Sequence, residues 1–424
     1  MKVSERLFIK NFSTIEKFDW EVKEFNVLTG GMGSGKSICV KLLWFFERIF
    51  HTLIFHSTIT KDDLHGSVFF DRIGEKFEDI FHIEKFDFRM TEINYTYSCN
   101  GNIFDLQAAW SESRECLLWA SNYLNSRFEQ WQGFFEVKNT TVPQINISEI
   151  VSERIFESIS KDFHNTFPIG PMFIPASRAI TTITDNTDFL DPFIVQFIKD
   201  TKRLISLFER FSNESANKIL HIKNIRYDKE RGLIITLQNG CEISPRHLSS
   251  GQQELLPMLL MINYLKHIIF NLGYPSLLAY ANRTSVFIEE PEAHLFPQDQ
   301  KETIEYIVEV FRLSKNKSRR GSERFFLTTH SPYILNIVST MMNRGALKKN
   351  LDELGENSLG SQYYFDEGEV SAHFIHTDGK VTSMVSKDGR YINAEEINDI
   401  SEIIFNEANS VDEELVKVKI RNAK

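Results

Sequence analysis

The chain has 424 residues, of which 42% are hydrophobic and 25% charged, and this composition is typical of a globular protein with a substantial core. Its formal net charge of −10 argues against a protein that coats nucleic acid with its whole surface, although it leaves a local basic patch open. The most apolar run, 255–270, is interrupted by Asn263, Lys266 and His267, so it indicates a buried or amphipathic helix and not a membrane span. The N-terminus lacks a signal-peptide pattern and the four cysteines are scattered, so we expect a cytoplasmic protein without a membrane partner.

The N-terminal half is expected to begin with three short strands, at 7–10, 18–22 and 25–29. The third strand runs into a cluster of glycines, and 38–50 then continues without a breaker as a buried helix. From about 67 to 105 the pattern predicts further short strands, and from about 111 onward it predicts helices over 112–135 and 148–163.

The second half alternates helices with strands. Residues 172–175 predict a brief strand, 189–220 a mostly helical segment, and 222–243 a hairpin that turns near Gly232. Helix, strand, helix, strand and helix follow to about 339, then short strands from 363 to 385 and a closing helix over 394–416. The absence of a sustained heptad pattern excludes a long coiled-coil arm.

The segment between the third strand and the next helix matches the P-loop pattern G-x-x-x-x-G-K-[ST] in full. In this pattern the glycines let backbone N–H groups turn inward around a phosphate, and the helix that begins there adds the positive end of its dipole. The lysine reaches the β- and γ-phosphates, and the hydroxyl that follows it faces Mg²⁺. With ATP and Mg²⁺ as cofactors, the predicted nucleotide-binding residues are Gly30, Gly31, Met32, Gly33, Ser34, Gly35, Lys36 and Ser37.

An apolar strand, 284–288, delivers two acidic residues at its end, as a Walker B element does. Such a run is common in proteins, but beside a P-loop in the same chain it predicts a site for a metal and a water. Glu289 and Ser37 are predicted to hold Mg²⁺, and Glu290 to polarise the attacking water.

A serine-rich segment opens a long helix ahead of this acidic pair, and it consists of Leu248, Ser249, Ser250, Gly251 and Gln252. It resembles the LSGGQ signature of ABC-type ATPases, with Ser250 in place of the first glycine. In that family the signature of one subunit caps the γ-phosphate in the P-loop of another, and a serine at a helix N-terminus suits an anion. The resemblance therefore implies a homodimer closed around two ATPs, whereas the segment alone would equally suit a helix cap.

A further strand ends in a histidine, at 325–330, and is similar to the switch, or H-loop, of the same family. This similarity implies that His330 contacts the γ-phosphate and is catalytic together with Glu290. The motifs imply an α/β fold, an ABC/SMC-type P-loop NTPase head with an N-terminal antiparallel β-subdomain and an inserted helical lobe. The implied parts are an N-lobe with the P-loop (1–51), a mixed insertion (52–165), a C-lobe with the other motifs (166–345), and C-terminal strands and a helix (346–424).

Two segments narrow the resemblance to one branch. EEPEAHL at 289–295 and TTHSPYIL at 328–335 resemble the OLD and Septu-type ATPases, which are relatives of SMC and RecF proteins found in bacterial anti-phage systems. Residues 9–12 and 173–178 are similar to that branch too, which implies a nucleotide contact for Asn11. The resemblance covers both ends of the chain but hardly any of 52–164.

Three features depart from this branch. Glu289 replaces the more usual aspartate, and Phe296 stands where relatives often have a histidine. The Q-loop residue stays open between Gln107 and Gln144. The residues after His330 carry no E…DxD metal cluster, so the TOPRIM nuclease of OLD proteins is missing. The resemblance therefore implies a sensor ATPase whose effector, for example a nuclease, is a separate protein.

Other functions remain open from the sequence. A RecF-like DNA-repair ATPase would bind DNA, and its candidate contacts are Arg178, Lys315, Lys317, Arg319 and Arg320. The last four lie in a run that a solvated loop also explains, and Arg178 suits a partner contact or a surface ion pair equally. The motor subunit of a membrane transporter fits less well, because the two narrowing segments resemble the soluble branch. A second active site within 52–164 has no Ser/His/Asp or metal cluster to support it.

Overall fold

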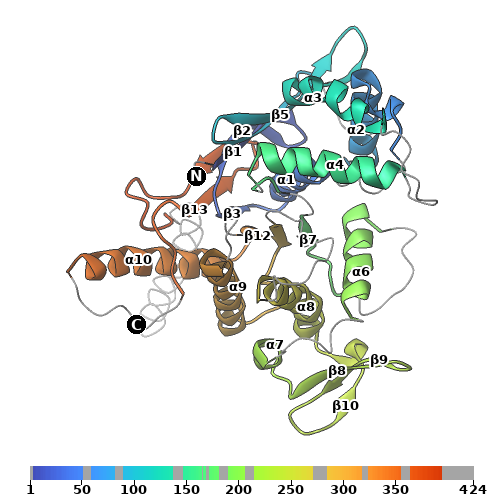
Figure 1. The fold of residues 1–424 in the computed structure, drawn as a ribbon. Helices are drawn as coiled ribbons and strands as arrows, with labels where there is room; N and C mark the ends of the chain where they lie inside the picture. Colours follow the sequence, from blue (N-terminus) through green and yellow to red (C-terminus); the bar gives the residue numbers. More distant parts are fainter. Residues whose placement is uncertain are drawn as a thin grey trace, which may run out of the picture.

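The computed structural model describes residues 3–50, 59–81, 89–136, 147–164, 166–168, 171–180, 190–205, 214–270, 284–317, 323–354 and 363–393. At its centre lies a sheet in the order β14–β13–β3–β12–β11–β7 (Figure 1). Neighbouring strands are parallel except for the β13–β14 pair. The strands are β3 (Phe25–Gly30), β7 (Met172–Ile174), β11 (Ser285–Glu289), β12 (Arg324–Thr329), β13 (Val370–Ile375) and β14 (Val381–Ser383).

The three strands that carry the predicted motifs, β3, β11 and β12, are buried along their whole length. Continuous apolar runs are what a parallel strand covered on both faces requires. Successive side chains of β11 serve opposite faces, since Phe287 belongs to one core cluster whereas Val286 and Ile288 belong to the other. Because the strands are parallel, the carboxyl ends of β3, β11 and β12 meet at one edge of the sheet.

A second, antiparallel sheet combines the N-terminal strands with part of the insertion, in the order β2–β1–β4–β5–β6. Its core side packs against α1 (Lys36–Phe50), where the ring of Phe46 stacks on Tyr95 at 5.1 Å between centroids. The predicted α/β fold with an N-terminal antiparallel subdomain is therefore confirmed. The strands are β1 (Val3–Phe12), β2 (Ile15–Val22), β4 (Glu92–Cys99), β5 (Asn102–Ser111) and β6 (Cys116–Ala120).

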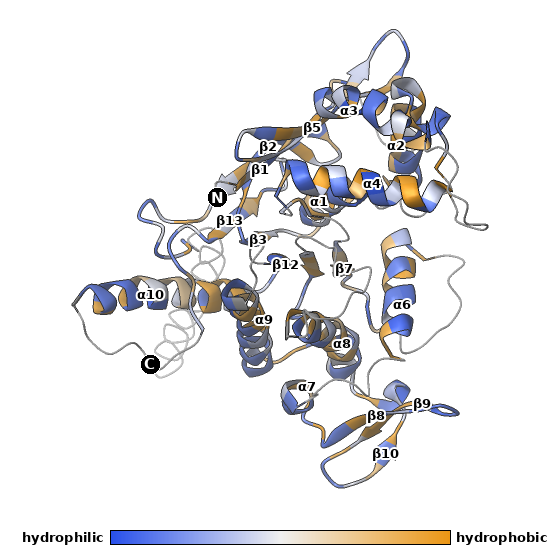
Figure 2. Ribbon diagram, in the orientation of Figure 1, coloured by the Kyte–Doolittle hydropathy of each residue, from blue (hydrophilic) through white to orange (hydrophobic). Residues whose placement is uncertain are grey.

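Helices cover both faces of the central sheet (Figure 1). The helix α1 lies on the side of the antiparallel sheet, and α8 (Ser250–Phe270), α9 (Pro297–Lys317) and α10 (Pro332–Leu354) lie on the other side, as the two core clusters require. Figure 2 shows hydrophobic and hydrophilic residues interspersed along α4 and α10, as expected for helices with one solvated side. No described helix is long and apolar enough to cross a bilayer.

Two predictions in the insertion are wrong. Residues 66–81, expected to be strands, form α2 (Gly66–Phe81), which buries Phe69, Ile73, Phe77 and Phe81. A spacing of four residues marks one face of a helix, and this period is the signal that the strand prediction missed. The start of the predicted helix over 112–135 is instead a turn and β6, which pairs with β5, so the helix α3 (Asn122–Gln132) begins later, capped by Ser121.

Other predicted elements are confirmed where the structure describes them. The hairpin is formed by β8 (Asn224–Asp228) and β9 (Gly232–Thr236), to which β10 (Glu242–Ile243) adds a third strand. Helices and short turns elsewhere are α4 (Ile147–Asp162), α6 (Pro192–Ile205), α7 (Glu214–Ile219), η2 (Asp62–Leu64), η4 (Gly133–Glu136) and η6 (Pro245–His247). The predicted closing helix over 394–416 lies outside the described residues, and the four domain ranges stay a prediction.

A buried arginine joins the two sheets at the amino end of β12. Arg324 forms ion pairs with Glu5 of β1 and with Glu47 of α1, the latter at 2.6 Å, and donates to the Ser285 hydroxyl at 2.8 Å. Burial lowers the pKa of Arg324, and the two carboxylates beside it hold the guanidinium in its charged form. The antiparallel sheet, α1 and the central sheet are thus fixed to one another through a single side chain.

The pH dependence of stability should contain a contribution from His373 of β13, which packs edge-on to Phe18 at 5.1 Å. Burial lowers the pKa of His373 to about 4. The unfolded chain, with an ordinary histidine pKa near 6.5, therefore takes up a proton that the folded chain resists, and stability falls as the pH drops from about 6.5 toward 4. We expect that the decrease in the free energy of unfolding between pH 7.5 and pH 5 is about 2 kcal/mol smaller in His373→Leu than in the wild type. Urea unfolding at pH 7.5 and 5.0 measures it, and equal pH dependence in both proteins would contradict the assignment.

Candidate nucleotide-binding site

The P-loop connects β3 to α1 and is held in place by close backbone contacts. Gly30 and Gly35 have φ of 148° and 102°, in the region that favours glycine. A Cβ at Gly30 would lie 2.2 Å from the carbonyl oxygen of Ile375, and one at Gly35 would lie 2.5 Å from Thr14 Oγ1. Thr14 also donates to the Ser34 carbonyl at 3.1 Å. The turn between β1 and β2 therefore supports the loop from outside, which the P-loop pattern alone does not indicate.

Lys36 lies at the first turn of α1, and its ammonium folds back over the loop. Its Nζ donates to the carbonyls of Gly30 at 3.1 Å and Gly31 at 2.8 Å. Burial lowers the pKa of Lys36, and the carboxylates of Glu290 and Glu292 oppose that shift. The lysine of the P-loop and the glutamates after β11 are therefore in one electrostatic environment.

Glu289 ends β11 as a buried carboxyl. Its Oε2 accepts from the Ala176 N–H at 3.3 Å, whereas its Oε1 is buried without a hydrogen-bond partner among the described residues. Burial raises the pKa of Glu289, and the Lys41 charge and the Ser37 hydroxyl lower it. A buried carboxylate with one unpaired oxygen, next to the Ser37 hydroxyl, is an arrangement that a cation would complete.

Glu290 follows in a left-handed backbone conformation, with φ of 44°, and its N–H donates to the Thr328 carbonyl at 2.9 Å. Its half-exposed carboxylate lies 3.6 Å from Nε2 of His330, which follows β12. The structure thus brings together the acid and the histidine that the sequence placed on separate strands. A carboxylate beside an imidazole at an accessible edge can accept a proton from a water molecule.

Glu292 is a further residue of this edge that was not predicted from the sequence. Its Oε1 accepts from the Thr329 hydroxyl and from the His330 N–H, each at 2.7 Å, so it fixes the start of the switch segment. Its Oε2 is buried without a hydrogen-bond partner in the described part of the chain. The signal was available, because the segment EEPE contains three glutamates and only the first two were interpreted.

The signature segment forms the exposed start of α8. Ser249 caps the helix, and its hydroxyl and N–H both contact Gln252 Oε1, at 3.0 and 3.1 Å. Gln252 in turn donates to the Leu220 carbonyl at 2.7 Å, and Leu248 is buried beneath the turn. A Cβ at Gly251 would lie 2.7 Å from the His294 carbonyl oxygen, so α8 begins in direct contact with the segment that follows Glu290.

The predicted contact of Arg178 with DNA or a partner is wrong. Its side chain is fully buried, it donates to four main-chain carbonyls, and its Nε lies 3.6 Å from a carboxylate oxygen of Glu254. Nε donates to Glu254 at 2.8 Å, Nη1 to Pro175 at 3.1 Å and to Glu289 at 2.8 Å, and Nη2 to Glu290 at 3.0 Å. An arginine with these partners cannot reach a phosphate, because leaving them would strand buried carbonyl groups.

The nucleotide contact predicted for Asn11 stays a prediction. Asn11 donates to the Met90 carbonyl at 3.3 Å and accepts from Thr91, beside β4. Lys315 forms ion pairs with Asp366 at 2.7 Å and with Glu369, which weakens its prediction as a DNA contact. The side chain of Lys317 is not described, and Arg319, Arg320 and Gln144 lie outside the described residues, whereas Gln107 is exposed on β5.

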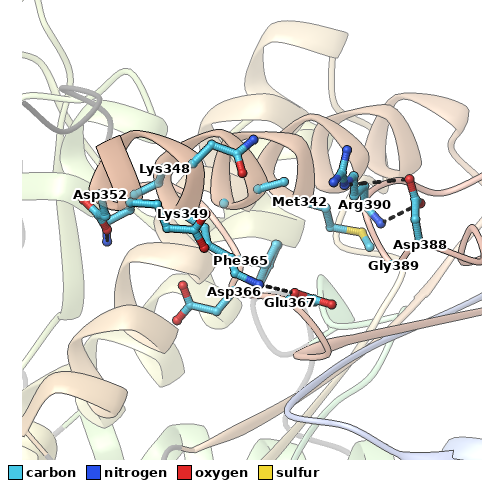
Figure 3. A pocket seen from close by; sticks show the side chains of 14 residues that line it. Met342, Lys348, Lys349, Asp352, Phe365, Asp366, Glu367, Asp388, Gly389 and Arg390 are labelled. Carbon is cyan, nitrogen blue, oxygen red and sulfur yellow. Dashed lines mark hydrogen bonds and ion pairs between the residues drawn. The ribbon is translucent and has the colours of Figure 1, made fainter. Parts of the chain in front are cut away.

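A separate cavity of about 800 Å³ lies between α10 and the C-terminal turns (Figure 3). Its walls carry charges of both signs, including the ion pairs of Lys349 with Glu367 at 2.8 Å and of Arg390 with Asp388 at 3.8 Å. Because these charges already pair with one another, the cavity offers no concentrated charge to a ligand. None of the predicted motif residues lines it.

Residues 78–335, more than half of the chain, match the family described as AAA ATPase domain (AAA_15). The chain belongs to this family. The match begins in α2, after the P-loop, and ends in α10, so it includes the signature, Glu289, Glu290 and His330. The protein is thus an ATPase, which binds and hydrolyses ATP. Among curated proteins, none matches the sequence.

Solved structures similar to this ATPase include SMC head domains and a RecF protein. The SMC head domain from Thermotoga maritima shares 14% identity over 80% of this chain and 92% of its own, with a TM-score of 0.37. The Smc head domain from Pyrococcus furiosus, bound to the C-terminal domain of ScpA, shares 11% over 95% and 100%, with a TM-score of 0.39. The recombination mediator RecF shares 13% over 90% and 98%, with a TM-score of 0.37. At this level of similarity, ligands and partners do not carry over from one protein to another.

Replacing Lys36 should abolish measurable ATP binding by the ATPase. We expect Lys36→Ala to raise the Kd for ATP by at least about a hundredfold, because charge-assisted hydrogen bonds to the phosphates are lost. Calorimetric titration measures it, with Lys10→Ala on the exposed side of β1 as the matched lysine control. ATP affinity within a few-fold of wild type in Lys36→Ala would overturn the assignment of the P-loop lysine.

Proposed function

We propose that the ATPase binds Mg-ATP at the common carboxyl edge of β3, β11 and β12. The observation that carries the proposal is the convergence of groups from three strands. Lys36 shares one electrostatic environment with Glu290 and Glu292, and His330 lies 3.6 Å from Glu290. Backbone N–H groups of residues 30–37 and the dipole of α1 would hold the phosphates. Lys36 would exchange its contacts with the Gly30 and Gly31 carbonyls for phosphate oxygens.

The residues present fit a hydrated Mg²⁺. We assign Ser37 and Glu289 to hold it, because the buried Oε1 of Glu289 has no partner in the described part of the chain. No three His, Cys, Asp or Glu side chains converge as a metal site within the described residues. Such a cluster is not required, since Mg²⁺ in phosphate sites keeps several waters and binds one or two protein ligands. When bound, the ion neutralises charge that develops on the phosphates.

For hydrolysis, we assign the proton-accepting role to Glu290. Its carboxylate is partly exposed, so a water can reach it, and its backbone is fixed by the bond to Thr328. His330 lies beside this carboxylate, with Nε2 3.6 Å from it, and its main chain is held by Glu292. His330 would orient the water and contact the γ-phosphate. Glu292 acts through His330 as a positioning residue.

A second copy of the chain would complete the site. Ser249 and Ser250 are exposed at the start of α8, and the contacts of this segment in its own chain are with residues other than the P-loop. The helix N-terminus is therefore available to cap the γ-phosphate of a partner. Because a homodimer has two-fold symmetry, two ATPs would lie in the interface.

Exposed apolar side chains around the same edge support this interface. Met32 in the P-loop is 90% exposed, Phe296 after the glutamates 79%, and Tyr333 after the switch 51%. Large apolar residues placed next to a polar site are typical of surfaces that are covered on association. Loss of the γ-phosphate would remove the contacts that bridge the two copies and open the dimer.

A trapped dimer tests this proposal. We expect Glu290→Gln to bind ATP as wild type does but to lower kcat by at least about a hundredfold, because the proton acceptor is lost. Native mass spectrometry with Mg-ATP should then show a homodimer that retains two nucleotides. The double variant Lys36→Ala/Glu290→Gln is the control and should stay monomeric. Undiminished hydrolysis in Glu290→Gln would remove Glu290 from the mechanism.

For the cellular role, we propose a sensor ATPase of an anti-phage system that controls a separate effector protein, for example a nuclease. The support is the resemblance of EEPEAHL at 289–295 and TTHSPYIL at 328–335 to OLD and Septu-type ATPases. The alternative, a RecF-like DNA-binding ATPase, has lost support, because Arg178 is buried and Lys315 is paired within the chain.

Co-expression of Glu290→Gln with the products of its neighbouring genes distinguishes these roles. We expect a second protein to co-purify in a fixed ratio, because the closed dimer is the state that an effector would recognise. Native mass spectrometry of the purified complex gives that ratio. A homodimer without a second protein, but with DNA retained and with hydrolysis stimulated by DNA, would favour the repair role.

A further inference from the structure

A buried guanidinium connects the signature helix to the catalytic edge. Arg178 donates to the carbonyl of Glu254, in the first turns of α8, and to the carbonyls of Glu289 and Glu290, at the end of β11. All of these bonds measure 2.8 to 3.0 Å, and the arginine is 0% exposed. A rigid, planar fork that bonds two segments at once transmits a shift of one to the other.

We infer that Arg178 is a positioning residue that couples the signature end of α8 to the catalytic carboxylate of Glu290. This inference rests on the proposed function, in which the signature contacts the γ-phosphate of a partner. Glu254 lies about one helical turn from Ser250, so its carbonyl moves with the helix start. When the γ-phosphate of a partner contacts the signature and shifts the start of α8, Arg178 would therefore shift the main chain of Glu290.

The main chain of Glu290 would respond to such a shift, because its conformation depends on a few contacts. Its φ of 44° is sparsely populated by residues other than glycine, so surrounding contacts have to hold it. Two of those contacts are the Arg178 bond to its carbonyl and its own N–H bond to Thr328. A small displacement of Arg178 would break its bond to the Glu290 carbonyl and change the direction of the Glu290 carboxylate.

A second junction runs beside the first. The start of α8 touches the segment after Glu290, where Gly251 faces the His294 carbonyl. That segment contains Glu292, which holds the main chain of His330. The signature helix, Glu290 and His330 thus form one contiguous unit, and the buried side chain of Arg178 links the first two of them.

A double-mutant cycle on kcat tests the coupling. Arg178→Lys keeps the charge but cannot span the same carbonyls, and Ser249→Ala removes the signature hydroxyl. We expect each to lower kcat by about tenfold, with ATP affinity within about twofold of wild type. If the two act through one relay, the double variant is no slower than the slower single variant. If the fold-changes multiply, Arg178 acts independently of the signature and the inference is overturned.

Controls separate this result from a loss of structure and from failure of the proposed function. Ile155→Ala, in the core of the insertion on α4, lowers stability away from the site, and its effect on kcat should multiply with that of Ser249→Ala. If Arg178→Lys does not fold, Glu254→Gln removes the α8 carboxylate that lies 3.6 Å from the Arg178 Nε, and it takes the place of Arg178→Lys in the cycle with Ser249→Ala. If Glu290→Gln forms an ATP-bound dimer but the fold-changes in kcat multiply, only the coupling through Arg178 is overturned. If Glu290→Gln stays monomeric with Mg-ATP, the proposed contact of the signature with a partner's nucleotide is overturned as well.

Discussion

The charge of Arg324, buried between the two sheets, is the constraint on which the rest of the molecule depends. A guanidinium removed from water needs partners, and here they come from β1 and α1, so neither element can shift without leaving a charge unpaired. The helix α1, which Arg324 holds through Glu47, begins with Lys36, and the strand β12, which contains Arg324, ends just before His330. Two elements of the nucleotide site are therefore anchored at the opposite end of the central sheet from the chemistry.

Much of the site could be predicted from the sequence because its parts are local. A glycine-rich turn between a strand and a helix, or an apolar strand ending in two glutamates, has a spacing that survives any tertiary arrangement. The parts that escaped prediction depend on distant partners. Arg178 follows a short strand in a polar turn, and only the arrival of Glu254 and Glu289 from elsewhere explains its burial. The helix α2 was missed because aromatic residues suit strands and helices alike, and the period of four decides between them.

The central sheet separates two kinds of buried arginine. Arg324 at the amino edge is paired with two carboxylates, whereas Arg178 at the carboxyl edge donates to main-chain carbonyls and has one carboxylate, that of Glu254, at 3.6 Å. Carboxylate pairs give strong fixation, since breaking them leaves charges buried. A hydrogen bond to a carbonyl is individually weaker, although losing it still leaves a buried carbonyl without a donor. The charge-based fixation is thus strongest where the two sheets join.

The left-handed conformation of Glu290 also limits how this protein can change over time. Glycine or asparagine would occupy that backbone conformation at lower cost, so stability alone would favour replacing the glutamate. The glutamate is retained because hydrolysis needs its carboxylate, and its strained backbone lowers the stability of the protein. A descendant released from hydrolysis, and retained for binding alone, should lose the glutamate early and become more stable as it does so.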